Sequence, residues 1–234
     1  MAVQPRHALI LADGDPPDAA ALAASWPGWS EGIDLIIAAD GGVRNAAGLG
    51  LGPVDLWVGD GDSLSAADRE GLHGAGTPME LAAEGKDESD TELAVLAAVD
   101  RGARRLTVLS PFGGRRLDHA FANALLLGHP RLADLSVVLL APTARVRLVR
   151  APGPDGGPVT LTLDGRRGDL VSLLPFAGPA GGVTTNGLEY PLADEPLEVG
   201  PARGLSNVRL ETTASVSLRN GSLLVVETPA TLSR

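Results

Sequence analysis

The sequence predicts an α/β domain with a mostly parallel sheet, followed by a smaller all-β domain of the sandwich or barrel type. Two observations carry this prediction. Up to residue 143, short apolar runs alternate with helix-like stretches, which is typical of a parallel sheet with helices on its faces. From residue 144 on, strand-like runs recur between Gly, Pro and Asn turns, and no long helical pattern remains. We therefore divide the chain into residues 1–143 and 144–234.

The first domain is expected to contain strands wherever an apolar run of strand length ends in turn-forming residues. These strands are expected at residues 7–12, 33–39, 54–58, 77–81, 105–109 and 136–140. The clearest helix begins after Ser89, because Ser89 and Glu92 have the spacing of a capping box, and Gly102 suits its end. Other helices are expected at residues 17–25, 43–47, 66–72 and 118–127.

The second domain is predicted from short β-prone runs alone. They lie at residues 146–149, 159–163, 170–174, 208–211, 214–218 and 223–227. Asn220-Gly221 separates the last two runs, and Asn-Gly between strands is a strong hairpin signal. We therefore expect the last two strands to pair with each other.

The charge of the chain is concentrated in one stretch. The net charge is −10, and residues 40–92 hold 12 acids but only three bases. A net-acidic chain without a basic tract disfavours nucleic acid and anionic membranes as partners. The absence of Cys excludes disulfides, Cys-ligated zinc and a thiol nucleophile. No signal-like segment opens the chain and its apolar runs are too short to span a bilayer, so we expect a cytoplasmic protein.

The acids fall where the predicted strands end. In an open parallel sheet, ligands bind outside the carboxyl ends of the strands. A site of clustered carboxylates suits Mg²⁺, which commonly binds one or two of them together with substrate phosphates. For any single Asp, a turn or helix cap is the better explanation. The joint pattern favours a metal–phosphate site. The five acids concerned are Asp40, Asp60, Asp62, Asp87 and Asp90.

Common nucleotide motifs are missing. The only Lys, Lys86, follows Gly85 but precedes Asp87, which does not fit a Walker A motif. No GxGxxG follows the first strand. A P-loop kinase and a classical NAD enzyme are therefore both disfavoured, although Gly41-Gly42 and Gly113-Gly114 would let the backbone approach a phosphate closely.

A second polar group precedes the helix expected at residues 118–127. Arg116 lies two residues before Asp118 and three before His119, and Arg is suited to bidentate phosphate contacts. The alternative is that these are solvated loop and helix-start residues. Taken alone, that alternative is favoured.

Taken together, the motifs resemble those of the thiamine pyrophosphokinase (thiamine diphosphokinase) family, in the family's order. The first four are Asp40-Gly41-Gly42, Gly59-Asp60-Gly61-Asp62-Ser63, Lys86-Asp87-Glu88-Ser89-Asp90 and Arg116-Leu117-Asp118-His119. Residues 168–174, 183–192, 204–207 and 221–226 resemble the C-terminal part of the family. The resemblance covers nearly the whole chain.

The resemblance implies an ATP- and Mg²⁺-binding catalytic domain of Rossmann-like fold and a thiamine-binding β-sandwich. It also implies a homodimer with its sites at the subunit interface. The implied reaction transfers pyrophosphate from ATP to thiamine. Metal ligands would be Asp60, Asp62, Asp87 and Asp90. Catalytic residues would be Asp62, Asp90, Arg116, Asp118 and His119. Substrate contacts would come from Asp40, Gly41, Gly42, Lys86, Ser206 and Asn207.

This chain departs from the family pattern at several points. Gly113-Gly114-Arg115-Arg116 has one residue more than the usual Gly-Gly-Arg, so that either Arg115 replaces a glycine or the loop is longer. Gly61 replaces a common aromatic residue, Ser89 a usual Thr and Val208 a frequent acid, and the C-terminal half has no Trp to stack on the thiamine pyrimidine. The general base is left open between Asp62 and Asp90. A Mg²⁺-dependent nucleotide phosphohydrolase and a non-catalytic nucleotide sensor are the alternative functions.

Overall fold

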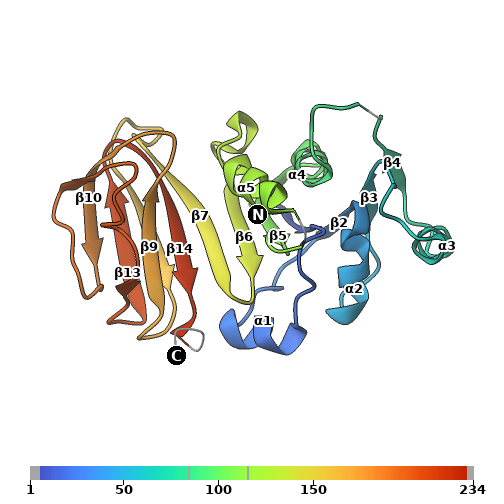
Figure 1. The fold of residues 1–234 in the computed structure, drawn as a ribbon, viewed down its shortest axis with the longest axis horizontal. Coiled ribbons are helices and arrows are strands. Elements are labelled where there is room, and N and C mark those ends of the chain that lie inside the picture. Colours follow the sequence, from blue (N-terminus) through green and yellow to red (C-terminus); the bar gives the residue numbers. More distant parts are fainter. Residues whose placement is uncertain (1–5, 84, 115, 231–234) are drawn as a thin grey trace, which may run out of the picture. The chain divides into compact units, whose positions relative to one another are not determined.

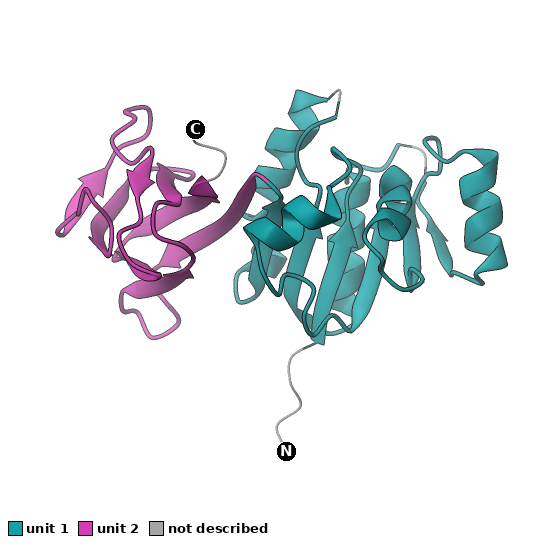
Figure 2. Ribbon diagram, turned by 90° about the horizontal axis from the view of Figure 1, so that it is seen from below, with its two compact units in different colours: residues 1–142 teal, residues 143–234 magenta. Residues whose placement is uncertain are grey.

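The structure, a computed structural model, describes residues 6–83, 85–114 and 116–230. The chain forms two compact units, residues 1–142 and 143–234 (Figure 2). Among the described residues, no helix is both long and apolar enough to cross a lipid bilayer.

Unit 1 contains a parallel sheet, as the alternation of strands and helices predicted. Its strand order is β6-β5-β1-β2-β3-β4, and every pair of neighbouring strands in it is parallel. The chain adds β2 to β4 on one side of β1 and then returns to add β5 and β6 on the other. Such a reversal opens a crevice at the carboxyl ends of the strands. The strands are β1 Arg6–Leu11, β2 Leu35–Ala39, β3 Leu56–Gly59, β4 Met79–Leu81, β5 Ala103–Leu109 and β6 Ser136–Ala141.

Helices cover both faces of this sheet. Figure 1 shows α4 and α5 on one face and α1 on the other. The core on the α1 side contains Leu22 of α1 and Trp26 just after it, Leu9 and Leu11 of β1, and Trp57 of β3. The helices are α1 Ala19–Ser25, α2 Arg44–Gly48, α3 Ala66–Gly74, α4 Asp90–Asp100 and α5 Leu117–Leu126, with 3₁₀ turns η1 at Asp40–Val43 and η2 at Pro130–Leu132.

The expected capping box of α4 is confirmed only in part. Ser89 is the N-cap, and its hydroxyl accepts from the Glu92 N–H at 3.2 Å. The Glu92 carboxylate instead lies 3.8 Å from His129 Nε2, because α4 passes beside the start of η2. The structure has a reciprocal capping box at α3, where Ser65 and Asp68 each bond the other's backbone N–H.

Unit 2 consists of antiparallel strands in two groups, β12-β9-β14-β7 and β11-β10-β13-β8. Both contribute to one apolar core, with Val171 and Leu223 from the first group and Leu163 and Val216 from the second. This agrees with the predicted all-β domain. Its strands are β7 Ala144–Ala151, β8 Val159–Asp164, β9 Leu170–Pro175, β10 Ala180–Asn186, β11 Glu195–Leu197, β12 Asn207–Val208, β13 Thr213–Leu218 and β14 Gly221–Thr228.

The predicted hairpin at Asn220-Gly221 is wrong. β13 pairs with β8 and β10, whereas β14 pairs with β7 and β9, so the turn carries the chain from one group of strands to the other. The backbone of Asn220 bonds Gly181 in both directions. Both edges of β13 are already occupied, and the local turn signal could not overcome that pairing.

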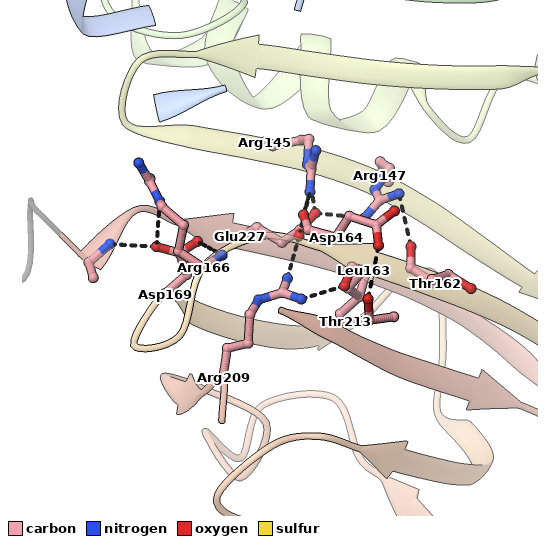
Figure 3. A network of polar contacts seen from close by, with 11 residues as sticks. Arg145, Arg147, Thr162, Leu163, Asp164, Arg166, Asp169, Arg209, Thr213 and Glu227 are labelled. Atoms are coloured by element: carbon pink, nitrogen blue, oxygen red, sulfur yellow. Dashed lines mark hydrogen bonds and ion pairs between the residues drawn. The ribbon is translucent and has the colours of Figure 1, made fainter. Parts of the chain in front are cut away.

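A buried ionic network lies in unit 2. The Glu227 carboxylate on β14 is 1% exposed and accepts hydrogen bonds from Arg145, Arg147 and Arg209 (Figure 3). The same arginines also donate to the Asp164, Thr162 and Leu163 carbonyls of β8. The network therefore connects β14, in the first group of strands, with β8, in the second.

Candidate active site

Three acids meet at the carboxyl edge of the parallel sheet. Asp40 directly follows β2, Asp60 directly follows β3, and Asp90 is the first residue of α4. One carboxylate oxygen of each lies within 4.8 Å of the others. Like charges this close repel one another unless a cation lies between them. These three residues are called the acid triad below.

Asp40 has an unusual backbone conformation and a buried carboxylate. Its φ is 43°, in the left-handed region that residues with side chains seldom adopt. Its side chain is buried, and Oδ1 has no hydrogen-bond partner among the described residues. Burial, together with the negative charges of Asp90, Asp62 and Asp13, raises the pKa of the Asp40 carboxyl. A buried carboxylate oxygen without a donor is the feature expected of a cation ligand.

Close packing explains why both residues after Asp40 are glycines. A Cβ at Gly42 would collide with the Leu11 carbonyl of β1, and a Cβ at Gly41 would collide with Arg44 and with the Asp13 carboxylate. The close approach permitted by Gly41-Gly42 is therefore to neighbouring protein groups. Whether these glycines also contact a phosphate stays a prediction.

Two arginines hold the loop that carries Asp60. Arg44 donates to the Ser63 carbonyl at 3.2 Å, to Asp68 at 3.1 Å and to Asp13 at 3.2 Å. Arg69 donates to the Gly61 carbonyl. Within the loop, the Asp62 N–H donates to Asp60 Oδ1 at 3.0 Å. The position of Asp60 is thus fixed by both local turn bonds and long-range contacts.

Lys86 lies at this edge as well. Its ammonium group forms an ion pair with Asp90, four residues later, and its side chain is 15% exposed. The pair gives the chain's only Lys an acid partner, and it offsets part of the negative charge of the acid triad.

The other predicted site residues of unit 1 do not belong to the acid triad, although the Asp62 N–H bonds Asp60 and the charge of Asp62 acts on Asp40. Asp62 and Asp87 are exposed. Arg116, Asp118 and His119 are exposed at the start of α5, where Arg116 and Asp118 form an ion pair. That pairing lowers the pKa of Asp118 to about 2. Arg115, in the longer loop, lies outside the described residues.

Two acids near the site were not predicted. Asp13 and Asp15 follow β1, so they also lie at the carboxyl edge of the sheet. Asp13 is paired with Arg44, and burial raises its pKa although Arg44 opposes this. Asp15 accepts from the Gly114 N–H at 2.7 Å, and a Cβ at Gly113 would collide with its carboxylate. Asp13-Gly14-Asp15 after the first apolar run was the available sequence signal.

In unit 2, Asn207 and Tyr190 line a pocket of about 280 Å³. The side chain of Asn207 makes three hydrogen bonds within the protein: it accepts from the Tyr190 and Val208 N–H groups and donates to the Tyr190 carbonyl. Ser206 is exposed beside it with φ 57°, and its N–H donates to Ser172. Asn207 therefore shapes the pocket wall. The other lining residues are Leu173, Pro191, Leu192, Arg203, Gly204 and Leu205.

Two family models match this chain, one for each unit. Residues 29–139 match the catalytic domain of thiamin pyrophosphokinase, and residues 159–223 match its vitamin B1 binding domain. Together the matches cover most of the chain. The chain belongs to the thiamin pyrophosphokinase family. The acid triad falls within the first match and the pocket beside Asn207 within the second.

Known thiamin pyrophosphokinases are distant in sequence and similar in fold. The thiamine pyrophosphokinase of Bacillus subtilis (strain 168) is 23% identical over 199 residues, which is 85% of this chain and 89% of that protein. A crystal structure of the Bacillus subtilis protein has a TM-score of 0.80 at 21% identity, covering 96% of this chain and 99% of that one. The yeast thiamin pyrophosphokinase structure has a TM-score of 0.76 at 15% identity, covering 98% and 88%. These structural likenesses establish the fold.

Proposed function

We propose that the protein is a thiamine diphosphokinase, which transfers the pyrophosphoryl group of ATP to the hydroxyl of thiamine and releases AMP. The observation that carries the proposal is the acid triad with its buried, unpartnered Asp40 oxygen, in a chain of this family. In this proposal unit 1 is the Rossmann-like, ATP- and Mg²⁺-binding catalytic domain, and unit 2 binds thiamine. We also propose a cytoplasmic location, where ATP is available.

The residues present fit a magnesium ion. Mg²⁺ prefers carboxylate oxygens, and Asp40, Asp60 and Asp90 each offer one within 4.8 Å of the others. When bound, the ion would neutralise charge on the triphosphate. We propose that Asp62 and Asp87 contribute to the metal site from its periphery. Both are exposed, and each is close in sequence to a residue of the triad, Asp62 to Asp60 and Asp87 to Asp90.

The remaining charged residues have separable proposed tasks. Lys86, paired with Asp90, would share its ammonium group with a phosphate oxygen. Arg116, Asp118 and His119 would contact the nucleotide from the start of α5. Asp62 is the better candidate for taking the proton of the thiamine hydroxyl, because Asp90 already pairs with Lys86.

The proposed thiamine pocket is the one beside Asn207. Tyr190 lines it with 63% of its surface exposed, so an aromatic ring is available to an aromatic ligand. Leu173 and Leu205 add apolar surface. Ser206 would supply a hydroxyl at its rim.

We further propose a homodimer with its sites at the subunit interface. Leu117, Phe121 and Leu125 recur every four residues on α5 and are 71%, 62% and 63% exposed. Three large apolar side chains on one helix face favour a protein partner. Arg116, Asp118 and His119 lie at the start of the same helix.

A Mg²⁺-dependent nucleotide phosphohydrolase is the alternative, because the acid triad alone does not specify the acceptor. The pocket in unit 2 favours the kinase, since a hydrolase uses water and needs no acceptor pocket. Incubation with ATP, Mg²⁺ and thiamine separates the two. AMP and thiamine diphosphate formed only when thiamine is present support the kinase. Phosphate release without thiamine supports the hydrolase, and no turnover in either case contradicts both.

A further inference from the structure

The strained backbone of Asp40 requires a support, and Trp57 contacts it. The indole N–H of Trp57 donates to the Asp40 carbonyl at 2.9 Å. The ring is fully buried. Trp57 lies on β3, opposite Ala38 of β2, so the side chain reaches from the middle of one strand to the residue just beyond the end of its neighbour.

The same ring lies under the loop that carries Asp60. A Cβ built at Gly59 would be 3.1 Å from Trp57 Cζ2 and 3.2 Å from the Cβ of Asp40. A Cβ built at Gly61 would be 3.5 Å from Trp57 Cη2. The indole therefore packs closely against Gly59, where a Cβ would be too tight, and a Cβ at Gly61 would lie at ordinary contact distance from the same ring.

A left-handed backbone at a residue with a side chain persists only where surrounding contacts hold it. At Asp40 the backbone direction decides where the carboxylate points, and Oδ1 has no protein donor of its own to orient it. The hydrogen bond from Trp57 fixes the carbonyl of this residue, and the ring limits how far the Asp60 loop can move toward it.

We propose that Trp57 is a positioning residue which holds Asp40 and the Asp60 loop in the arrangement that binds the cation. The inference rests on the proposed metal site but concerns a residue that touches neither ion nor substrate. Trp57 affects the affinity of the acid triad for Mg²⁺, and it affects activity only because activity depends on that affinity.

Trp57→Phe tests this, because it removes the N–H and keeps most of the ring. Trp26→Phe is a matched control. Trp26 is also buried in unit 1, and its indole N–H donates to a backbone carbonyl, that of Ala141, at 2.8 Å. Both variants lose one buried hydrogen bond of the same kind, so a general loss of stability affects both.

The measurement is the dissociation constant for Mg²⁺ alone, by calorimetric titration without ATP or thiamine. We expect Trp57→Phe to weaken binding by about fivefold or more, the factor for one lost hydrogen bond, and Trp26→Phe to leave it unchanged. The activity of Trp57→Phe should recover when Mg²⁺ is raised. Equal affinities in the two variants, or an activity loss that Mg²⁺ does not restore, overturn the proposal.

A second variant covers the case in which Trp57→Phe does not fold. Gly59→Ala places a methyl group between the indole and Asp40, and it should weaken Mg²⁺ binding in the same direction; unchanged affinity overturns the proposal. If the unmodified protein does not bind Mg²⁺, the metal site and this inference both fail. If it binds Mg²⁺ but forms no thiamine diphosphate, only the proposed reaction fails.

Discussion

Lys86, in the loop before α4, forms an ion pair with Asp90 at the start of that helix, and the pair places the chain's only Lys beside one member of the acid triad. Asp90 also lies in the first turn of α4, where the helix dipole stabilises a negative charge. Of the three acids, Asp90 thus has two sources of compensation. Asp40 and Asp60 have no cation paired with them among the described residues, which leaves these two most dependent on a bound ion.

Asp60→Asn should therefore abolish activity without weakening the fold. We expect kcat/KM for thiamine to fall by at least about 100-fold, because a metal-ligand charge is lost. The free energy of unfolding should stay within about 0.5 kcal/mol of the original, since the change also removes repulsion within the triad. Glu70→Gln, an exposed acid on α3, is the control and should leave both quantities unchanged. Normal turnover of Asp60→Asn would show that the metal site is wrongly assigned.

The stability of unit 1 should fall in mild acid because of His7. The His7 ring is buried on β1 with Nε2 3.0 Å from Thr107 Oγ1, and burial lowers its pKa below 6.5, with Arg105 acting in the same direction. Between the folded pKa and 6.5 the unfolded chain binds more protons than the folded one, so stability decreases as pH falls through that window. All three Trp residues lie in unit 1, so Trp fluorescence reports its unfolding.

The urea midpoint measured by Trp fluorescence should drop between about pH 7.5 and about pH 5.5. His7→Gln, which cannot titrate there, should show a smaller drop whatever its stability at neutral pH. His73→Gln changes an exposed His on α3 and should behave like the unmodified protein. Identical pH slopes for all three proteins would exclude His7 as the cause.

Glu227→Gln should destabilise unit 2 strongly. The change removes the negative charge that pairs with Arg145, Arg147 and Arg209, and breaking a buried ion pair from one side costs about 3–5 kcal/mol. Hydrogen exchange of the β7 and β14 amides should accelerate accordingly. Glu195→Gln breaks the exposed pair with Arg203 and should cost about 1 kcal/mol or less. A similar small effect for both variants would contradict the importance of the buried network.

Phe121→Glu should convert the proposed dimer to a monomer. A charge in the middle of the exposed apolar face of α5 would be buried against the partner, which should raise the dimer dissociation constant by at least about tenfold. Light scattering after size exclusion gives the mass directly. Val199→Glu, at a 59% exposed position of unit 2, is the control. A monomeric starting protein, or a Phe121→Glu variant that stays dimeric, would refute this interface.

The sequence was sufficient for the parallel sheet and for the position of its acids. Hydrophobic runs determine which segments form strands, and an acid placed after such a run must lie at the sheet edge. The sequence could not show which acids meet. Asp90 joins the triad because it is the first residue of α4, whereas Asp87, three residues earlier in the preceding loop, is exposed. Nor could it show the left-handed backbone of Asp40, which depends on contacts with Trp57 from another strand.

Unit 2 was harder to predict in detail. β10 begins Ala180-Gly181-Gly182 and β11 contains Pro196, and these residues weaken the strand signal. A strand was expected at residues 208–211, but the structure has only the two-residue strand β12, Asn207–Val208. The hairpin at Asn220-Gly221 failed for a different reason: turn propensity is local, whereas the choice of partner strand depends on residues more than forty positions away, such as β8 for β13.

The position of β14 within its group of strands has a consequence for synthesis on the ribosome. All six strands of unit 1 precede residue 142, so this sheet can assemble while unit 2 is still being made. In unit 2, β14 lies between β7 and β9 and is the last of these strands to be translated. Until residues 221–228 leave the ribosome, β7 and β9 each lack this neighbour, and the arginines on β7 lack Glu227. The nascent chain therefore contains a complete N-terminal unit and an incomplete C-terminal one. The emergence of β14 supplies the strand that pairs with both β7 and β9.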